Sequence, residues 1–477
     1  MKASALIKEI GITDTKKAVY FEKRYEDLKK RGFTNENIIK ALIKSEYEGR
    51  FSAVKRSHAG MYDKMNYMCR CYMDRTARMA LFYDFIPDTD ILRHSILCLY
   101  EMSPVMHSKF VDNHIAPYWK TADYTADEVF RTEEVEDLKK AEYDFLTPSL
   151  PVDAHIQAPI ALFTKGNECV FCLKWNHMVM DGVGCGTFVM DIMANYVRFK
   201  NGDYSKPHYK TGSRHYKKVY EDMPKEMAKK AKMQFGNSSP REKKTLPFTP
   251  VGKDDRNLLI EKEVPAEIFE AARLKAKSEG ATANDVITAA FARAFYKISG
   301  TDENEDVVVS CAVDLRRHIK DLSTVGYTNH AAFMPCVFPK MGKDMSESVQ
   351  IARESTKKAK EDEFMGLHGL PLLNIAYNTM IYAQAELVIK LFYNNANLAI
   401  SNVGTIAGAL YCFDGHKPLS AFGSGGAKKK PCGFVTTQSI GGRLNLIMAL
   451  QGNDQDEKMV IRFFDMIEKE LEAYAFA

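Results

Sequence analysis

The chain has 477 residues, which is too many for one ordinary hydrophobic core and fits two or three domains of common size. The composition, with 45% hydrophobic and 27% charged residues, is that of a soluble globular protein. The 66 basic and 62 acidic residues leave a formal net charge of +4, an excess too small to indicate a nucleic-acid partner.

The N-terminal region has no targeting or membrane signal. Residues 1–9 interrupt their apolar stretch with charges before a signal-peptide core could form, and no later run approaches membrane-spanning length. We therefore expect a cytoplasmic protein without a transmembrane segment. Residues 14–50 are charged and helical in character, so residues 1–58 are predicted to be a helical N-terminal addition.

After this addition the pattern changes to alternating strands and helices. Residues 66–85 are predicted to be rich in strand, residues 88–101 to form a helix with an apolar face, and residues 104–110 to begin another strand. Farther along the chain, a hairpin is predicted to pair strands at residues 160–163 and 168–175.

A short histidine motif, Asn-His-Met-Val-Met-Asp-Gly at residues 176–182, follows this hairpin directly. His177 at the end of a strand suits a general base, because imidazole has the side-chain pKa closest to neutral pH. Asp181 is expected to fix the loop without touching the substrate, and Gly182 to let the backbone turn tightly into a helix that ends at Asn201. The pattern HxxxDG by itself is equally compatible with a histidine that packs at a strand end and is satisfied by backbone groups.

A change in composition marks the expected domain boundary. Residues 200–244 contain thirteen Lys or Arg against five Asp or Glu, and the Gly-Asn-Ser-Ser-Pro run at 236–240 indicates an exposed linker. We therefore predict an N-terminal lobe at residues 59–240 and a C-terminal lobe at residues 241–477.

The second half repeats the alternation of strands and helices. Thr282 and Asp285 have the spacing of a helix capping box, which explains this Thr-x-x-Asp without any chemistry. A final helix is predicted from the apolar stripe between Val460 and Leu471. The other predicted elements are strands at residues 258–264, 307–313, 398–400 and 444–450, and a helix at residues 266–277.

Five motifs occur in a fixed order, namely His177-x-x-x-Asp181-Gly182, Gly280–Val286, Val313–Arg316, Ser401–Gly404 and Gly442–Leu446. This ordered set resembles the condensation-domain superfamily, which includes nonribosomal-peptide condensation domains, alcohol O-acetyltransferases and wax-ester synthases. The resemblance covers roughly residues 60 to 475, and five ordered motifs are far more specific than any one of them.

The resemblance implies an α/β (α+β) fold with two chloramphenicol-acetyltransferase-like lobes, each a mixed sheet with helices, that form a V with a central tunnel. His177 would lie in the tunnel as general base, Asp181 and Gly182 would shape its loop, and Ser401 and Asn402 would contact substrate. The implied reaction moves an acyl group from a thioester, either acyl-CoA or the phosphopantetheine arm of an acyl carrier protein, to a small-molecule hydroxyl or amine acceptor, without an acyl-enzyme. No permanently bound cofactor and no metal are expected.

One departure from the family pattern bears on activity. Relatives usually have Leu-Arg where this chain has Met106-His107, so the expected arginine partner of Asp181 is missing there. His107, Lys109 and Arg316 remain open as substitutes. The departure motivates an alternative function, a catalytically silent relative that binds a carrier protein or another partner through the same groove.

Other features receive ordinary structural explanations. The ten cysteines are scattered in apolar contexts and are predicted to be reduced core residues; Cys169 and Cys172 lie three apart on a strand and face opposite sides, so they do not share an ion. The absent Asp-Phe-Gly-Trp-Gly signature argues against the plant-type branch of the superfamily. Two basic runs, Lys428–Lys430 and Lys229–Lys232, could meet a phosphorylated donor, but a solvated surface is the preferred explanation for both.

Overall fold

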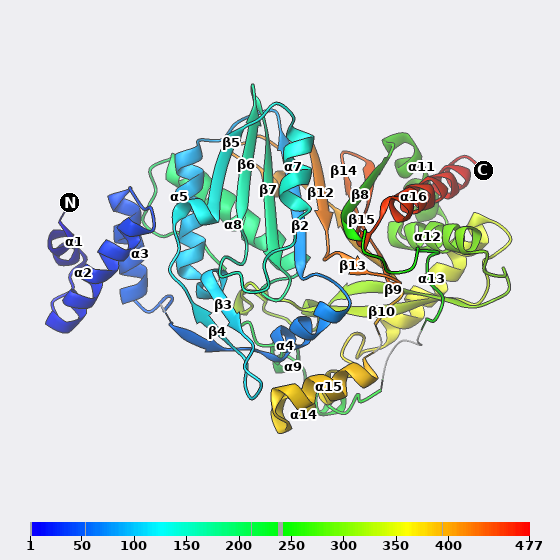
Figure 1. Cartoon of the computed structure of the whole chain (residues 1–477), viewed down its shortest axis with the longest axis horizontal. Helices are drawn as coiled ribbons and strands as arrows, with labels where there is room; N and C mark the ends of the chain where they lie inside the picture. Colours follow the sequence, from blue (N-terminus) through cyan, green and yellow to red (C-terminus); the bar gives the residue numbers. More distant parts are fainter. Residues whose placement is uncertain (1, 53, 211, 237–241, 394) are drawn as a thin grey trace.

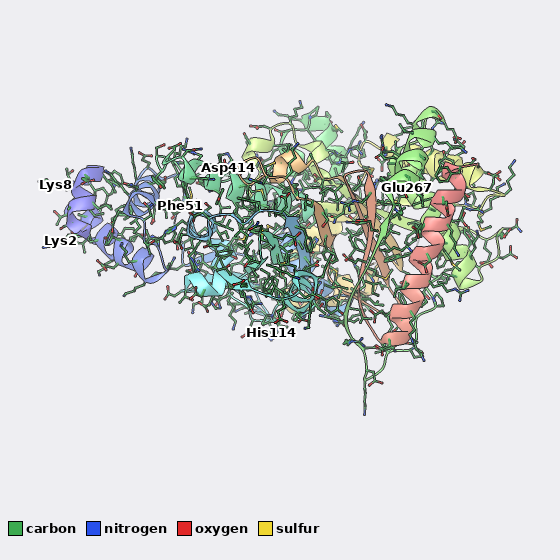
Figure 2. The ribbon with its side chains drawn as sticks, turned by 90° about the horizontal axis from the view of Figure 1, so that it is seen from above. Lys2, Lys8, Phe51, His114, Glu267 and Asp414 are labelled. Carbon is green, nitrogen blue, oxygen red and sulfur yellow. The ribbon has the colours of Figure 1, made fainter. Side chains whose placement is uncertain are left out.

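The computed structural model describes residues 2–52, 54–210, 212–236, 242–393 and 395–477. Three N-terminal helices lie at one end of an elongated molecule, followed by two large sheets with their covering helices (Figure 1). Seen from above, Lys2 and Lys8 mark the N-terminal end, and the C-terminal helix α16 (Asp454–Ala475) lies toward the other end (Figure 2). Within the described ranges, no helix is both long enough and apolar enough to cross a membrane.

The N-terminal addition is helical, as the charge pattern indicates. Asp14 and Asn35 cap the second and third helices through their side-chain oxygens. The helices dock on the rest of the molecule through a buried ionic contact, in which Arg24 and Arg31 both pair with Glu101. The three helices are α1 (Ala3–Ile10), α2 (Thr15–Lys30) and α3 (Glu36–Tyr47).

The first large sheet contains five strands in the order β12-β2-β7-β6-β5. Successive side chains of β7 point to opposite faces. Phe171 and Leu173 belong to the same core as α5 and α8, whereas Val170 and Cys172 pack with α7 on the other face. The strands are β2 (Thr76–Tyr83), β5 (Phe130–Glu134), β6 (Ile160–Lys165), β7 (Glu168–Asn176) and β12 (Ser420–Ser424), and the helices are α5 (Thr89–Met102), α7 (Leu138–Leu146) and α8 (Gly182–Lys200). The predicted hairpin, the helix at 88–101 and the helix after the histidine motif are thus confirmed.

Two predicted strand regions are partly wrong. The region 66–85 begins with the end of helix α4 (Met61–Met68) and a turn, η1 (Cys69–Cys71), and only β2 is a strand. The Asp63 carboxylate accepts the Gly60 N–H at 2.9 Å and caps α4, a signal that the strand interpretation overlooked. Likewise, a turn, η2 (Pro104–His107), precedes the expected strand, because Pro104 fixes the backbone at its start. That strand belongs to a small sheet of β1 (Arg56–His58), β4 (Tyr118–Thr121) and β3 (Ser108–Val111).

The second large sheet has the order β10-β9-β11-β14-β15-β13, and β8 pairs with β15. Thr282 and Asp285 form the predicted capping box at the start of α12. The strands are β8 (Arg256–Val264), β9 (Val307–Asp314), β10 (Ala331–Phe338), β11 (Leu398–Thr405), β13 (Lys428–Lys429), β14 (Gly433–Ile440) and β15 (Arg443–Gly452). Helices α11 (Ala266–Ser278), α12 (Ala283–Ser299) and α13 (Met345–Glu361) pack with α16 against this sheet (Figure 1).

One strand of the second half belongs to the sheet of the first half. Strand β12, from the second half, pairs along its length with β2 of the first sheet. The expected division at residues 240 and 241 falls outside the described residues and stays a prediction. The remaining helices and turns are α6 (Ala126–Val129), α9 (Lys218–Glu221), α10 (Lys225–Ala231), α14 (Leu370–Thr379), α15 (Tyr382–Phe392), η3 (Leu315–His318), η4 (Leu322–Thr324) and η5 (Gly408–Tyr411).

Candidate active site

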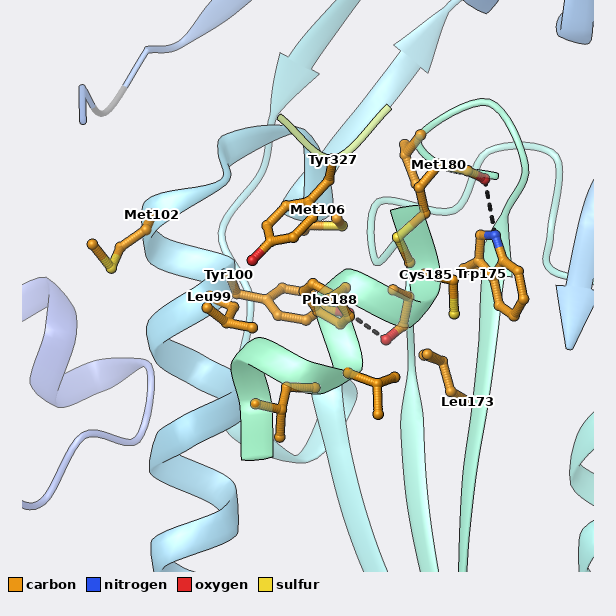
Figure 3. Packing of buried hydrophobic residues seen from close by; sticks show 14 of the residues in the cluster. Leu99, Tyr100, Met102, Met106, Leu173, Trp175, Met180, Cys185, Phe188 and Tyr327 are labelled. Carbon is orange, nitrogen blue, oxygen red and sulfur yellow. Dashed lines mark hydrogen bonds between the residues drawn. The ribbon is translucent and has the colours of Figure 1, made fainter. Parts of the chain in front are cut away.

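The histidine motif lies in a short, tightly held loop between β7 and α8. The His177 N–H donates to the Arg75 carbonyl at 2.7 Å, which ties the loop to the strand next to β7. Within the loop, Trp175 Nε1 donates to the Met180 carbonyl at 2.9 Å (Figure 3). Asp181 is the N-cap of α8 and accepts the Gly184 N–H at 2.8 Å. Backbone and capping bonds therefore fix the position of His177.

Asp181 forms a two-point ion pair with Arg316 from the second half of the chain. Arg316 Nη1 lies 2.8 Å from Asp181 Oδ2, and Nη2 lies 3.1 Å from Oδ1. Both side chains are buried, at 5% and 9% exposure. Arg316 Nη2 also donates to the Thr328 carbonyl at 2.8 Å. Such a fork geometry is the strongest form of a protein ion pair and joins the two halves beneath the histidine loop.

Of the three candidate partners of Asp181, the structure shows that Arg316 is the one in contact with it. Lys109 pairs with Asp153 at 3.3 Å, and His107 Nδ1 contacts the Ala122 carbonyl at 2.9 Å, so both are engaged elsewhere. Burial by itself would raise the pKa of Asp181, but the Arg316 charge and hydrogen bonds from Arg316 and from backbone N–H groups outweigh it and hold that pKa below its usual value. Asp181 is therefore an anion at neutral pH.

Asn329 contacts both the ring and the backbone carbonyl of His177. Its amide orientation is fixed, because Oδ1 accepts the Ala331 N–H at 3.0 Å and Nδ2 donates to the His177 carbonyl at 2.9 Å. The same Nδ2 lies 2.9 Å from His177 Nδ1. No hydrogen-bond partner of His177 Nε2 occurs in the described part of the chain, so Nε2 is the nitrogen left for a ligand.

The ring of His177 is poised in its neutral form. Burial lowers its pKa, attraction to Asp181 opposes that effect, and the positive charge of Lys428 adds to the lowering, so that the pKa lies below the ordinary value of 6.5. A neutral imidazole at physiological pH is the form that can accept a proton.

His177 lines a cavity of about 280 Å³ between the two halves. The first half contributes Met65, Asn66, Cys69, Tyr72, Met73, His177, Asp181 and Gly182 to its wall. The second half contributes, among others, Ser310, Asn329, Phe333, Ser401, Lys428 and Phe434. The wall therefore mixes apolar surface with a few convergent polar groups, as ligand sites do.

The other predicted site residues fare differently. Ser401 lines the cavity, but Asn402 does not; its Oδ1 accepts the Gly404 N–H at 2.9 Å in a local irregularity of β11. Gly182 also lines the cavity, yet its φ is not positive and a Cβ there would meet no atom within 4 Å. The tight approach is at Gly184 instead, where a Cβ would lie 2.9 Å from the Thr328 carbonyl oxygen. The backbone reason given for Gly182 is therefore wrong, while its place at the site stays a prediction.

The run Lys428–Lys430 is not a solvated patch. Lys428 lines the cavity, Lys429 Nζ donates to the Arg70 carbonyl at 2.9 Å, and Lys430 is buried in an ion pair with Asp456 at 3.0 Å. The sequence does not single out Asn329, and it indicates Lys428 only as part of a basic run for which a solvated surface is the preferred explanation. Both belong to short runs, residues 326–330 and 428–430, whose polar members do not reveal which side chain faces the cavity.

A family model described as "Condensation domain" matches residues 82–378, which is more than half of the chain. The matched segment contains His177, Asp181, Arg316 and Asn329. No curated protein has a sequence that matches this chain significantly.

Solved structures with the same fold have little sequence identity. The first condensation domain of the calcium-dependent antibiotic synthetase, in complex with a substrate analogue, has 16% identity and a TM-score of 0.66 over 89% of this chain and 98% of that chain. The trichothecene 15-O-acetyltransferase TRI3 of Fusarium sporotrichioides has 12% identity and a TM-score of 0.61, over 88% and 95%. The starter condensation domain of rhizomide synthetase RzmA, a double mutant in complex with C8-CoA and Leu-SNAC, has 11% identity and a TM-score of 0.60, over 89% and 95%. These similarities confirm the predicted fold, with its two chloramphenicol-acetyltransferase-like lobes.

Proposed function

Because the chain belongs to the condensation-domain family, as its ordered motifs predicted, we propose that it is an acyltransferase in which His177 is the general base. The acyl group would come from a thioester of coenzyme A or of a carrier protein's phosphopantetheine, and the acceptor would be a hydroxyl or an amine. One observation carries this proposal: His177 Nε2 has no partner among the described residues, and its ring lines a cavity shared by both lobes.

The chemistry needs one proton carrier. The acceptor oxygen or nitrogen attacks the thioester carbonyl carbon while His177 Nε2 takes the acceptor's proton. The tetrahedral oxyanion then collapses, the carbon–sulfur bond breaks, and the leaving thiolate receives the proton from the imidazolium. This sequence requires the tautomer with a proton on Nδ1, which then donates to the carbonyl of His177 itself. Asn329 Nδ2 is also a donor and lies 2.9 Å from Nδ1, so in this tautomer its hydrogens must point to the His177 carbonyl and away from the ring.

The surrounding residues support this role by positioning. Asp181 is fully engaged by Arg316 and by the N–H groups of Gly184 and His330, so it orients the loop and has no capacity left for a substrate. The thioester is a co-substrate in this proposal, and no permanently bound cofactor takes part. Among proteins of this fold, the RzmA domain binds C8-CoA, which agrees with a coenzyme A thioester as one of the two donors considered.

The proposal is tested by thiol release and product mass spectrometry, with a panel of acyl-CoA thioesters against alcohols and amines. His177→Ala should lower turnover by about a hundredfold or more while the protein stays folded, because the ring contributes to proton transfer and little to packing. His114→Ala is the matched control, since His114 is exposed at the surface (Figure 2). Unchanged turnover of folded His177→Ala would remove His177 from the mechanism.

The alternative is a catalytically silent binding protein. It was motivated by the missing arginine at position 107, but Arg316 pairs with Asp181 in its place. It predicts partner binding that is indifferent to His177→Ala, together with no thiol release from any thioester. Thiol release that requires both an acceptor and His177 would exclude it.

A further inference from the structure

Lys428 is a cation in the cavity without an acidic partner. It is the first residue of β13, where it pairs with Leu450. Its Nζ lies 3.3 Å from the sulfur of Met73 and 5.1 Å from the centre of the Phe434 ring. Within the described ranges, no carboxylate oxygen approaches Nζ within 4 Å. A thioether and an aromatic face are favourable neighbours of an ammonium group, but they carry no countercharge.

The adjacent lysines show what a satisfied lysine looks like in this segment. Lys430 Nζ lies 2.8 Å from Asp255 and 3.0 Å from Asp456, and Lys429 donates to a backbone carbonyl. Lys428 alone of the three lines the cavity. A charge removed from water is costly unless an opposite charge accompanies it. The placement of Lys428 is therefore best explained by an anion that arrives with a ligand.

The ionisable neighbours in the cavity wall do not supply that anion. Asp181 is held by Arg316, and Glu242 accepts the backbone N–H groups of Lys244 and Val308 at 2.8 and 2.7 Å. His368 faces Asp362 at 2.6 Å. His177 is neutral in its resting form, as its lowered pKa indicates. Lys428 is therefore the cation of the described wall, and no acidic group of the described residues lies within 4 Å of it; Glu242 also has no ion-pair partner among them, but both of its oxygens accept backbone N–H groups.

We propose that Lys428 binds a carboxylate carried by one of the two reactants, either the acyl acceptor or the acyl group. This inference rests on the proposed function and narrows the substrate class to amino or hydroxy acids as acceptors, or to dicarboxylic acyl groups as donors. The phosphates of coenzyme A are not the anion, because the whole pantetheine arm separates them from the thioester that must reach His177. Lys428 and His177 line the same cavity, so a carboxylate bound at Lys428 would share that cavity with the reacting carbonyl.

Paired substrates test the proposal. In the first arm, amino and hydroxy acids are compared with their methyl esters as acceptors; in the second arm, succinyl-CoA is compared with butyryl-CoA as donor. Wild type should prefer the carboxylate in one arm. In Lys428→Met, kcat/KM for that carboxylate should fall roughly ten- to hundredfold, mainly through KM, as for the loss of a charge-assisted hydrogen bond, and the neutral analogue should change little.

Two further variants make the result specific. Lys429→Met is the matched control and should keep the preference, since Lys429 does not line the cavity. Lys428→Arg should restore part of the preference, because it restores the positive charge. Lys428→Gln replaces Lys428→Met if the latter does not fold.

An equal loss for charged and neutral partners would overturn the proposal and assign Lys428 to the oxyanion or to packing. A wild type that shows no carboxylate preference in either arm would overturn it as well. If none of these substrates is turned over, the affinities of the same acids and esters for wild type and Lys428→Met are measured by calorimetry. The acids should then bind wild type more tightly than their esters do, and this preference should be lost in Lys428→Met. Turnover that persists in His177→Ala would refute the proposed base without touching this inference.

Discussion

Breaking the Asp181–Arg316 pair should destabilise the protein as well as slow it. Asp181→Asn keeps the shape of the side chain but removes the negative charge that faces Arg316 at 2.8 and 3.1 Å. Because both side chains are buried, removal of one partner leaves an uncompensated charge, at a cost of about 3–5 kcal/mol in the free energy of unfolding. In addition, the NH₂ group of the new asparagine side chain would face the backbone N–H of Gly184 or of His330, both of which now donate to the carboxylate. Two donors would then meet without a hydrogen bond.

A double-mutant cycle in denaturant unfolding isolates the pair. Arg316→Met should cost a similar amount, and the double variant should cost less than the sum of the single variants by roughly 0.5–3 kcal/mol. His177→Ala serves as the contrast, with unfolding near that of wild type. Full stability of Asp181→Asn together with lost activity would refute the structural role and make Asp181 a direct participant in catalysis.

The pH dependence of protein stability tests the same prediction independently. The pKa of Asp181 is lowered in the folded state, so its contribution to stability is present above its unfolded pKa of about 3.9 and is lost as the pH falls through the lower folded pKa. The stability difference between wild type and Asp181→Asn should therefore shrink below about pH 4. A difference that stays constant in acid would show that the charge of Asp181 is not its cause.

Two further predictions follow from the site. The acid limb of the kcat/KM profile should lie below pH 6.5, because activity is lost when His177 is protonated. In Lys428→Met this limb should move to higher pH, since removal of the positive charge of Lys428 raises the pKa of His177. An unmoved limb would contradict this electrostatic interaction. Gly184→Ala should lower the melting temperature more than Gly182→Ala, because a Cβ at Gly184 would lie 2.9 Å from the Thr328 carbonyl oxygen and one at Gly182 meets nothing within 4 Å; equal melting temperatures would argue against that close approach.

Local signals made much of the fold predictable. The hairpin of β6 and β7 follows from two apolar runs with a turn between them, and α12 begins where Thr282 and Asp285 form a capping box. Helix α4 was missed because a helix of eight residues offers little more than two turns of periodicity, and its cap comes from the Asp63 side chain, inside the helix.

The long-range contacts of the site could not be predicted in the same way. His107, Lys109 and Arg316 all have the charge or hydrogen-bonding capacity to meet Asp181, and only the packing of η3 beneath the loop selects Arg316. Lys428 shows the same limit. Three consecutive lysines look alike in the sequence, and their different surroundings come from Met73, Asp456 and a backbone carbonyl far along the chain.

Both halves of the chain position His177. The loop that carries His177 belongs to the first half, whereas Arg316 and Asn329, which hold the loop and its carbonyl, belong to the second. A motion that separated the halves at this point would break the buried ion pair, at a cost of several kcal/mol. The carboxylate selectivity proposed for Lys428 would act in the same cavity, whose wall both halves of the chain form.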